Sequence, residues 1–295
     1  MAPNTTKNQR IDDIELVHED RGMGVPLLLV HGFPLDHSMW AAQIEALAPV
    51  CRVIVPDLRG FGRSGRAPGV SPGMASPRFA DHPRADARGS PLQVSVSMEQ
   101  LADDLAALLD ALGIAEPIVL CGLSMGGYVA FQFCRKYAAR LRGLVLCDTR
   151  AAADTPEVAA GRLVMADRVL REGPAPLVET MIPRLFSTET AQQRPEVVAA
   201  LRNVMMSNDP RGIAAAARGM AERPDSTPML GEIRCPTLVL VGQHDALSTP
   251  AEMRSIAAAI PHSQFVEISA AGHMSPLENP EAVTTALKEF LARLA

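Results

Sequence analysis

A serine flanked by glycines carries the clearest chemical signal in the chain. Ser124 lies in the run Gly122–Gly127 (GLSMGG), which follows an apolar strand ending at Cys121 and precedes a segment able to form a helix. A serine on a sharp turn between strand and helix has a strained backbone, and side chains two residues before or after it would collide with the neighbouring chain. Because motif and context agree, the pattern predicts that Ser124 is a nucleophile.

A serine hydroxyl is a weak nucleophile, so this interpretation requires a histidine that accepts its proton. His273 follows the expected strand Gln264–Ile268 and precedes the last helix. It therefore lies in a loop at the carboxyl end of the sheet, where the serine also projects, and it is the expected base. His244 competes because it adjoins a candidate acid. The other histidines outside the first glycine-containing loop are expected to be solvated: His18, His37, His82 and His262.

An acidic side chain has to reach the far nitrogen of the imidazole, where it fixes the tautomer and stabilises the positive charge. Asp245 meets this need because it follows the expected strand Pro236–Val241. The resulting chain order of serine, aspartate and histidine is the one expected for a nucleophile on a strand-to-helix turn. Asp148 is the rival, since it also ends a strand at this edge of the sheet.

The oxyanion of a tetrahedral intermediate needs two converging backbone N–H donors. Met125, immediately after the nucleophile, is expected to supply one of them. The loop His31–Pro34 follows the strand Pro26–Val30, and there a glycine precedes Phe33, whose N–H is the second expected donor. The histidine that opens this loop is expected to brace it.

The elements that must position these side chains follow from the hydrophobic pattern. Predominantly apolar runs, such as Leu27–Val30 and Thr237–Val241, suit central strands covered on both faces. Strands that alternate with helical patterns predict a mostly parallel, doubly wound α/β sheet. The expected strands are Ile14–His18, Pro26–Val30, Arg52–Val55, Pro117–Cys121, Leu141–Cys147, Pro236–Val241 and Gln264–Ile268.

Two of the intervening helices carry capping signals at their starts. Ser97 stands three residues before Gln100, at the head of a run with leucines at helical spacing. Thr249 stands in the same relation to Glu252, with a proline between them that suits a first helical turn. We expect helices to begin at both places.

Two stretches interrupt the alternation of strands and helices. Residues 66–93 hold five prolines among glycine, serine and charged residues, so they are expected to form an irregular loop, either a lid or plain surface. Residues 151–228 are helical in pattern with no strand between, which predicts an inserted helical cap. The core domain is then expected to comprise residues 1–150 and 229–295.

The composition excludes several classes of protein. With 47 % hydrophobic and 21 % charged residues over 295 positions, the chain can bury a large core and is not disordered as a whole. A net charge of -5 without a basic cluster disfavours nucleic acid as a partner. No apolar run is long enough for a bilayer, and the polar opening Met1–Arg10 lacks the apolar stretch of a signal peptide, so a cytoplasmic location without membrane contact is expected. The five cysteines form no Cys-x-x-Cys pair and fit small core side chains in a reducing compartment.

Several motifs in a fixed order resemble those of the α/β-hydrolase superfamily, over nearly the whole chain. They are His31–Pro34 (HGFP), Asp57–Ser64 (DLRGFGRS), Gly122–Gly127 and Gly272–His273. Within that superfamily, the first motif, the serine motif and His273–Pro280 (HMSPLENP) look like those of bacterial carboxylesterases, cofactor-free haloperoxidases or perhydrolases, and 3-oxoadipate enol-lactonases.

The resemblance implies hydrolysis of a small-molecule ester or lactone through an acyl-enzyme, without a cofactor or metal. It assigns the nucleophile to Ser124, the base to His273, the acid to Asp245, and the oxyanion donors to Phe33 and Met125. Perhydrolysis and a receptor-like protein that keeps the triad remain alternatives. The serine disfavours haloalkane dehalogenases and epoxide hydrolases, which resemble the chain elsewhere but use an aspartate there.

The sequence leaves the substrate and the oligomeric state open. Arg218, near the end of the helical stretch, could pair with a substrate carboxylate such as that of an enol-lactone. A solvated arginine is the favoured interpretation.

Overall fold

The apolar runs form the centre of one eight-stranded sheet in the computed structural model, which describes residues 6–11, 14–64 and 94–294. The strand order is β1-β2-β4-β3-β5-β6-β7-β8. Strands from β4 to β8 in this order pair in parallel, whereas β1 with β2 and β2 with β4 pair antiparallel. The strands are β1 Thr6–Ile11, β2 Ile14–Arg21, β3 Pro26–Val30, β4 Arg52–Pro56, β5 Ile118–Leu123, β6 Leu141–Cys147, β7 Thr237–Gly242 and β8 Gln264–Ile268.

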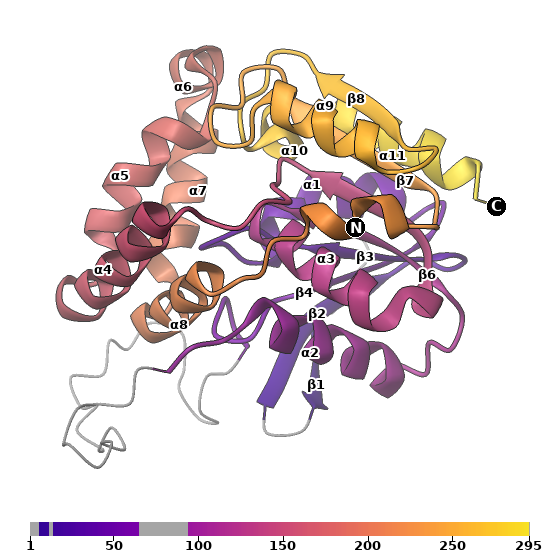
Figure 1. The fold of residues 1–295 in the computed structure, drawn as a ribbon, viewed down its shortest axis with the longest axis horizontal. Coiled ribbons are helices and arrows are strands. Elements are labelled where there is room, and N and C mark those ends of the chain that lie inside the picture. Colours follow the sequence, from indigo (N-terminus) through magenta and orange to yellow (C-terminus); the bar gives the residue numbers. More distant parts are fainter. Residues whose placement is uncertain (1–5, 12–13, 65–93, 295) are drawn as a thin grey trace.

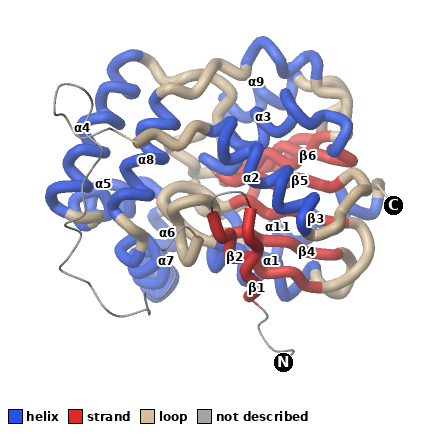
Figure 2. Tube along the Cα trace, turned by 90° about the horizontal axis from the view of Figure 1, so that it is seen from below, coloured by secondary structure: helices blue, strands red, loops and turns tan. Residues whose placement is uncertain are grey.

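Helices cover both faces of this sheet (Figures 1 and 2). Alternate residues of β3 divide between two hydrophobic clusters, with Leu28 in the one that contains α2, α3 and α9, and Leu27 in the one that contains α1 and α11. Burying such a leucine completely contributes about 2 kcal/mol. The predicted mostly parallel, doubly wound α/β sheet is confirmed.

The helices are α1 Ala41–Leu47, α2 Met98–Ala111, α3 Met125–Tyr137, α4 Pro156–Glu172, α5 Ala175–Leu185, α6 Thr188–Gln193, α7 Pro195–Ser207, α8 Pro210–Ala221, α9 Pro250–Ala259, α10 Ser275–Glu278 and α11 Pro280–Ala292, with 3₁₀ turns η1 His37–Trp40, η2 Ala138–Arg140 and η3 Thr227–Glu232.

Both predicted capping signals are confirmed. The Ser97 side chain accepts a hydrogen bond from the backbone N–H of Gln100 at the start of α2. The Thr249 side chain likewise accepts from the N–H of Glu252 at the start of α9. Each bond satisfies one of the amides that the first helical turn leaves without a partner.

Helices α4–α8 lie between β6 and β7 in the chain, and we call them the helical insertion. Figure 1 shows α4 to α7 gathered at one side of the sheet, with α8 returning toward the core. The insertion follows the carboxyl end of β6, where the serine turn after β5 also lies. The expected loop 66–93 falls outside the described residues.

The first strand of the sheet was missed by the sequence analysis. Strand β1 is polar up to its last residue (TKNQRI), so it offers no hydrophobic alternation from which a strand could be predicted. It pairs residue by residue with β2, from Thr6 opposite Glu19 to Ile11 opposite Ile14. Tertiary pairing, rather than a local signal, defines this edge of the sheet.

Among the described residues, no helix is long and apolar enough to cross a membrane.

Candidate active site

Ser124 sits at a strained turn between β5 and α3. Its backbone has φ 54° and ψ -112°, a conformation that side-chain-bearing residues rarely adopt. A side-chain carbon at Gly122 would lie 2.2 Å from the carbonyl oxygen of Gly126, and one at Gly126 would lie 2.4 Å from that of Val30. Only glycine fits at both positions, as the sequence predicts, and the half-buried serine side chain projects from the carboxyl edge of the sheet.

The structure brings Ser124, His273 and Asp245 together in one line of hydrogen bonds. Nε2 of His273 lies 2.9 Å from Oγ of Ser124, and Nδ1 of the same ring lies 2.8 Å from Oδ2 of Asp245. With Nδ1–H donating to the carboxylate, Nε2 is left as an acceptor for the serine hydroxyl. These residues come from the ends of β5, β7 and β8, which are far apart in the chain.

The loop after β7 holds Asp245 so that one oxygen stays available for the histidine. Oδ1 of Asp245 accepts the N–H groups of Leu247 and Ser248, at 2.7 and 3.0 Å. Oδ2 is then free to accept from His273. The carboxylate is thus oriented by its own loop before it contacts the base.

The electrostatics around His273 favour its protonated form. Burial by itself would lower the pKa of the ring, but the charge and hydrogen bond of Asp245, followed by the charges of Asp148 and Glu278, raise it above the ordinary value. A base whose protonated form is stabilised accepts a proton from a serine more readily.

Asp148, the rival acid, is close enough for its charge to act on His273, but its oxygens accept hydrogen bonds from other groups. Its Oδ1 accepts the N–H of Gly242 at 2.7 Å, and its Oδ2 accepts the hydroxyl of Ser275 at 2.5 Å. The side chain is completely buried. Burial first, and then the charge of Asp245, raise the pKa of Asp148 to about 7. The two aspartates therefore share a site but differ in what binds them.

The loop after β3 lies directly against the nucleophile. A side-chain carbon at Gly32 would approach Cβ of Ser124 to 3.4 Å. Phe33 follows and is buried edge-to-face against Phe61. Met125 is the first residue of α3, so its N–H belongs to the turn of the helix that lacks intrahelical partners. Both predicted donors therefore lie on the segments that flank Ser124.

His31 braces this loop, as predicted. Its Nδ1 lies 2.9 Å from the carbonyl oxygen of Gly32, and its Nε2 accepts the N–H of Leu58 at 3.0 Å. Burial lowers the pKa of the ring, which suits the neutral tautomer that these two bonds require.

His37 supports the same region, and the prediction that it is solvated is wrong. Its Nδ1 lies 2.6 Å from Oδ1 of the completely buried Asp57, which also accepts the N–H groups of His37 and Arg63. Burial opposes the charged ring, yet the hydrogen bond to Asp57 and its charge raise the pKa of His37. With Asp36 these two residues form a cluster of metal-ligand type, but the oxygens of Asp57 already accept those hydrogen bonds.

Two further predictions of solvation are wrong. His18 is buried because it lies on β2 in the interior of the paired strands. Arg218 is also buried, and its guanidinium donates to Asp167 on α4 and to the carbonyl of Val94. The ion pair between Arg218 and Asp167 joins α8 to α4. By contrast, His262 and the rival base His244 are exposed.

Glu278 was not identified from the sequence as a functional residue. Its Oε1 accepts the N–H groups of Gly272 and Met274, on either side of His273, at 2.8 and 3.2 Å. Its Oε2 accepts the N–H of Ser187 in the helical insertion, at 2.8 Å. The only hint in the sequence is the acidic residue shortly after the base, a spacing that by itself does not predict these contacts.

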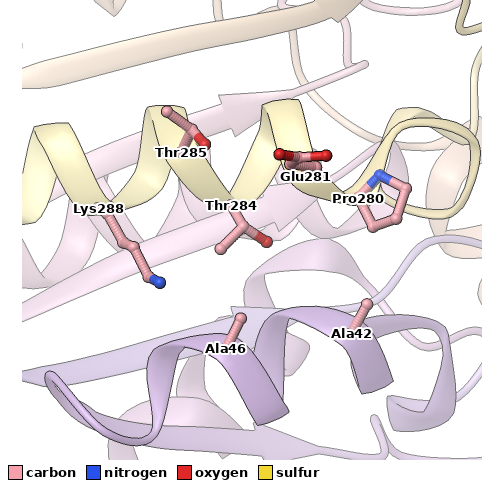
Figure 3. A pocket seen from close by; sticks show the side chains of 7 residues that line it. All are labelled: Ala42, Ala46, Pro280, Glu281, Thr284, Thr285 and Lys288. Atoms are coloured by element: carbon pink, nitrogen blue, oxygen red, sulfur yellow. The ribbon is translucent and has the colours of Figure 1, made fainter.

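A surface groove lies between α1 and α11, away from these residues (Figure 3). Small side chains of α1 face it from one side, and polar side chains of α11 face it from the other. It contains none of the predicted site residues. Its lining comprises Ala42, Ala46, Pro280, Glu281, Thr284, Thr285 and Lys288.

The alpha/beta hydrolase fold family matches residues 25–280. The structure of a thermophilic esterase from Thermogutta terrifontis, with malate bound, is 50 % identical and has a TM-score of 0.87, covering 98 % of this chain and 99 % of that one.

Two lactonases are also similar. The structure of the enol-lactonase from Burkholderia xenovorans is 30 % identical with a TM-score of 0.82, over 97 % of this chain and all of that chain. The 3-oxoadipate enol-lactonase 2 of Acinetobacter baylyi is 28 % identical over 90 % of this chain and 88 % of its own. The similarity to each extends over both the sheet and the helical insertion.

Proposed function

Because the chain belongs to the alpha/beta hydrolase fold family, we propose that it is a serine hydrolase that cleaves small carboxylic esters through an acyl-enzyme. The family match confirms the resemblance inferred from the sequence motifs, and the esterase and enol-lactonase similarities support hydrolase activity. The single observation that carries the proposal is the hydrogen-bonded line from Ser124 through His273 to Asp245.

In the proposed mechanism, Oγ of Ser124 attacks the ester carbonyl carbon as Nε2 of His273 takes the hydroxyl proton. Asp245 stabilises the imidazolium that forms and keeps Nδ1 protonated. The imidazolium then donates its proton to the leaving alkoxide, which departs as an alcohol. Water, deprotonated by the same ring, then attacks the acyl carbon. The bond between that carbon and Oγ breaks, the imidazolium returns its proton to Oγ of Ser124, and the carboxylic acid is released.

The N–H groups of Phe33 and Met125 are the proposed donors to the oxyanion. What supports them is position: Met125 is the first residue of α3, and Phe33 follows Gly32, where an added side-chain carbon would come within 3.4 Å of Cβ of Ser124. Donors already held by the backbone need no rearrangement when negative charge develops on the substrate oxygen.

We also propose the domain organisation that the sequence predicts. Residues 151–228 act as a cap, and residues 1–150 with 229–295 act as the hydrolase core. The position of α4–α8 between β6 and β7, next to the edge that carries Ser124, supports a role in selecting the substrate. Residues 66–93 remain a predicted loop insertion of the core.

Enol-lactone hydrolysis is the second candidate activity, because the similarity to two enol-lactonases covers nearly the full chain. A lactone is a cyclic ester, so the same acyl-enzyme chemistry applies and the alcohol stays attached to the acyl group. The alternative in which Arg218 pairs with a substrate carboxylate loses support, since its guanidinium donates to Asp167. The 50 % identical esterase favours a linear ester.

The test is turnover of p-nitrophenyl acetate beside an enol-lactone of similar size, with Ser124→Ala as the control. We expect the ester to be turned over by the wild-type protein and the variant to lose several orders of magnitude in kcat. Turnover that survives the substitution would exclude Ser124 as the nucleophile. Faster turnover of the lactone would select the second candidate, and binding without turnover would indicate a receptor-like protein.

A further inference from the structure

The helical insertion and the loop that carries His273 meet on one buried carboxylate. Glu278 is only 6 % exposed and belongs to the short helix α10. Its two oxygens face different partners: Oε1 accepts N–H groups from the His273 loop, and Oε2 accepts the N–H of Ser187, between α5 and α6. One side chain therefore fixes two segments that are distant in the sequence.

Other contacts join the same two segments. The N–H of Met274 also donates to the carbonyl of Leu185, the last residue of α5, at 3.1 Å. Arg194, between α6 and α7, donates from its guanidinium to the carbonyl oxygens of Glu278 and Leu277, at 2.8 and 3.2 Å. The insertion thus contacts both the loop before α10 and the last two residues of α10.

The two segments approach so closely that a side chain would not fit between them. A side-chain carbon at Gly272 would lie 2.7 Å from the backbone nitrogen of Ser187 and 2.9 Å from the carbonyl carbon of Phe186. Main chain packs directly on main chain beside His273. A shift of the insertion at this point would have to be followed by the loop, because tightly packed segments transmit displacement.

We propose that Glu278 is a positioning residue that couples the seating of the helical insertion to the orientation of His273. This inference rests on the proposed function, because it gives His273 the role of base. Glu278 accepts the N–H groups on both sides of that residue. The backbone of His273 is therefore held in place, and with it the orientation of the imidazole ring. When the bond to Ser187 breaks, the carboxylate loses one of its anchors and the imidazole leaves its alignment with Oγ of Ser124.

A displacement of the order of 1 Å at a catalytic base can cost up to about a hundredfold in rate. Because Glu278 does not touch the reacting atoms, its loss should act through the base alone. The charge of Glu278 also contributes to the raised pKa of His273, together with those of Asp245 and Asp148. Substitution should therefore change the pH profile as well as the rate.

The first test is Glu278→Gln beside the matched control Glu281→Gln, an exposed carboxylate at the start of α11. The amide keeps one acceptor oxygen but turns an NH₂ group toward a second N–H donor. We expect kcat/KM per active site, counted by fluorophosphonate titration, to fall by about tenfold relative to the control. The acidic limb of its pH profile should move to lower pH. Equal values of kcat/KM in the two variants, together with acidic limbs at the same pH, would overturn the proposal.

The second test leaves Glu278 intact and removes only its partner in the insertion. Ser187→Pro deletes the N–H at a residue whose φ of -61° suits proline, whereas Ser187→Ala keeps that N–H and removes only the capping hydroxyl. We expect the proline variant to be about tenfold slower than the alanine variant in fluorophosphonate labelling. This pair also decides the question if Glu278→Gln does not fold.

Amide hydrogen exchange separates this inference from the proposed function. In Ser187→Pro the amides of Gly272 and Met274 should exchange faster than in Ser187→Ala, whether or not the protein hydrolyses esters. A wild-type protein that fails to label at Ser124 would refute the proposed function, while faster exchange would still support the coupling. Identical exchange and identical labelling in the two variants would refute the coupling.

Discussion

The loops after β6 and β7 deliver a buried aspartate to the same edge of the sheet, yet only one of these side chains contacts the histidine. Asp245, after β7, has one oxygen occupied by its own loop and offers the other to Nδ1 of His273. Asp148, after β6, has both oxygens occupied by Gly242 and Ser275. Both side chains are buried, so the difference lies in the groups that bond to their oxygens.

This comparison shows how two similar carboxyl groups can take different roles. The carboxylate of Asp245 is ready to stabilise an imidazolium. Burial and the neighbouring charge of Asp245 raise the pKa of Asp148 to about 7. Through its hydrogen bonds, Asp148 joins the segments that carry Asp245 and His273. Asp148 is bonded to the start of the Asp245 loop and to the segment just after His273.

The largest expected effect comes from Asp245→Asn. The amide is close in shape to the carboxylate, but it can present an NH₂ group to Nδ1 and so favour the wrong tautomer of His273. We expect kcat for p-nitrophenyl acetate to fall by about three to four orders of magnitude with little change in Tm. A loss of less than about tenfold would exclude Asp245 as the acid of the proposed triad.

A much smaller effect is expected from Asp148→Asn. The amide oxygen can still accept the N–H of Gly242, and the amide nitrogen can donate to Oγ of Ser275, so both tethers survive in modified form. Its kcat should stay within about tenfold of wild type. If this variant were the more damaged of the two, the roles of the aspartates would have to be exchanged.

The pH profile sharpens the comparison further. Because activity needs neutral His273, whose pKa is raised, kcat/KM of the wild-type protein should rise with pH through an apparent pKa above 6.5. The acidic groups around the ring are Asp245, Asp148 and Glu278. Removing the charge in Asp148→Asn should shift this limb to lower pH. An unshifted limb would indicate that Asp148 carries no charge in the working enzyme.

The smallest expected effect is on stability. A pKa of Asp148 raised from 3.8 to about 7 means that the folded protein holds this proton more tightly than the unfolded chain. The stability from this group is fully present below pH 3.8, is lost as the pH rises from there through about 7, and changes no further once the folded group is deprotonated. Relative to wild type, the Tm of Asp148→Asn should therefore increase by roughly a few degrees between about pH 5 and about pH 8. Thermal melts across this range provide the check, and a constant difference would contradict the raised pKa.

Much of this arrangement could be predicted from local patterns. Apolar runs predict the central strands. Glycines whose replacement would clash with the backbone predict the turn at Ser124. Topology alone could not choose between Asp148 and Asp245, since both follow strands at one edge. The choice depends on which groups reach each oxygen. The N–H groups that hold Asp245 come from its own loop, but the partners of Asp148 and the histidine that meets Asp245 are distant in the sequence.

The contacts missed by the sequence analysis share this long-range origin. Strand β1 is defined by pairing with β2, and Glu278 by backbone groups of the helical insertion. His18 and Arg218 were expected to be solvated because their side chains are polar, but tertiary packing buries both. Side-chain type predicts exposure poorly where a strand or helix is covered on each side.

The most direct test of the account is the labelling of Ser124 by a fluorophosphonate, followed by peptide mapping and by the labelling rate in Asp245→Asn and Asp148→Asn. We predict one adduct per chain, on Ser124. The labelling rate should fall by orders of magnitude in Asp245→Asn and stay within about tenfold of wild type in Asp148→Asn. An adduct on another residue, or equal labelling rates in the two variants, would contradict the proposed triad of Ser124, His273 and Asp245.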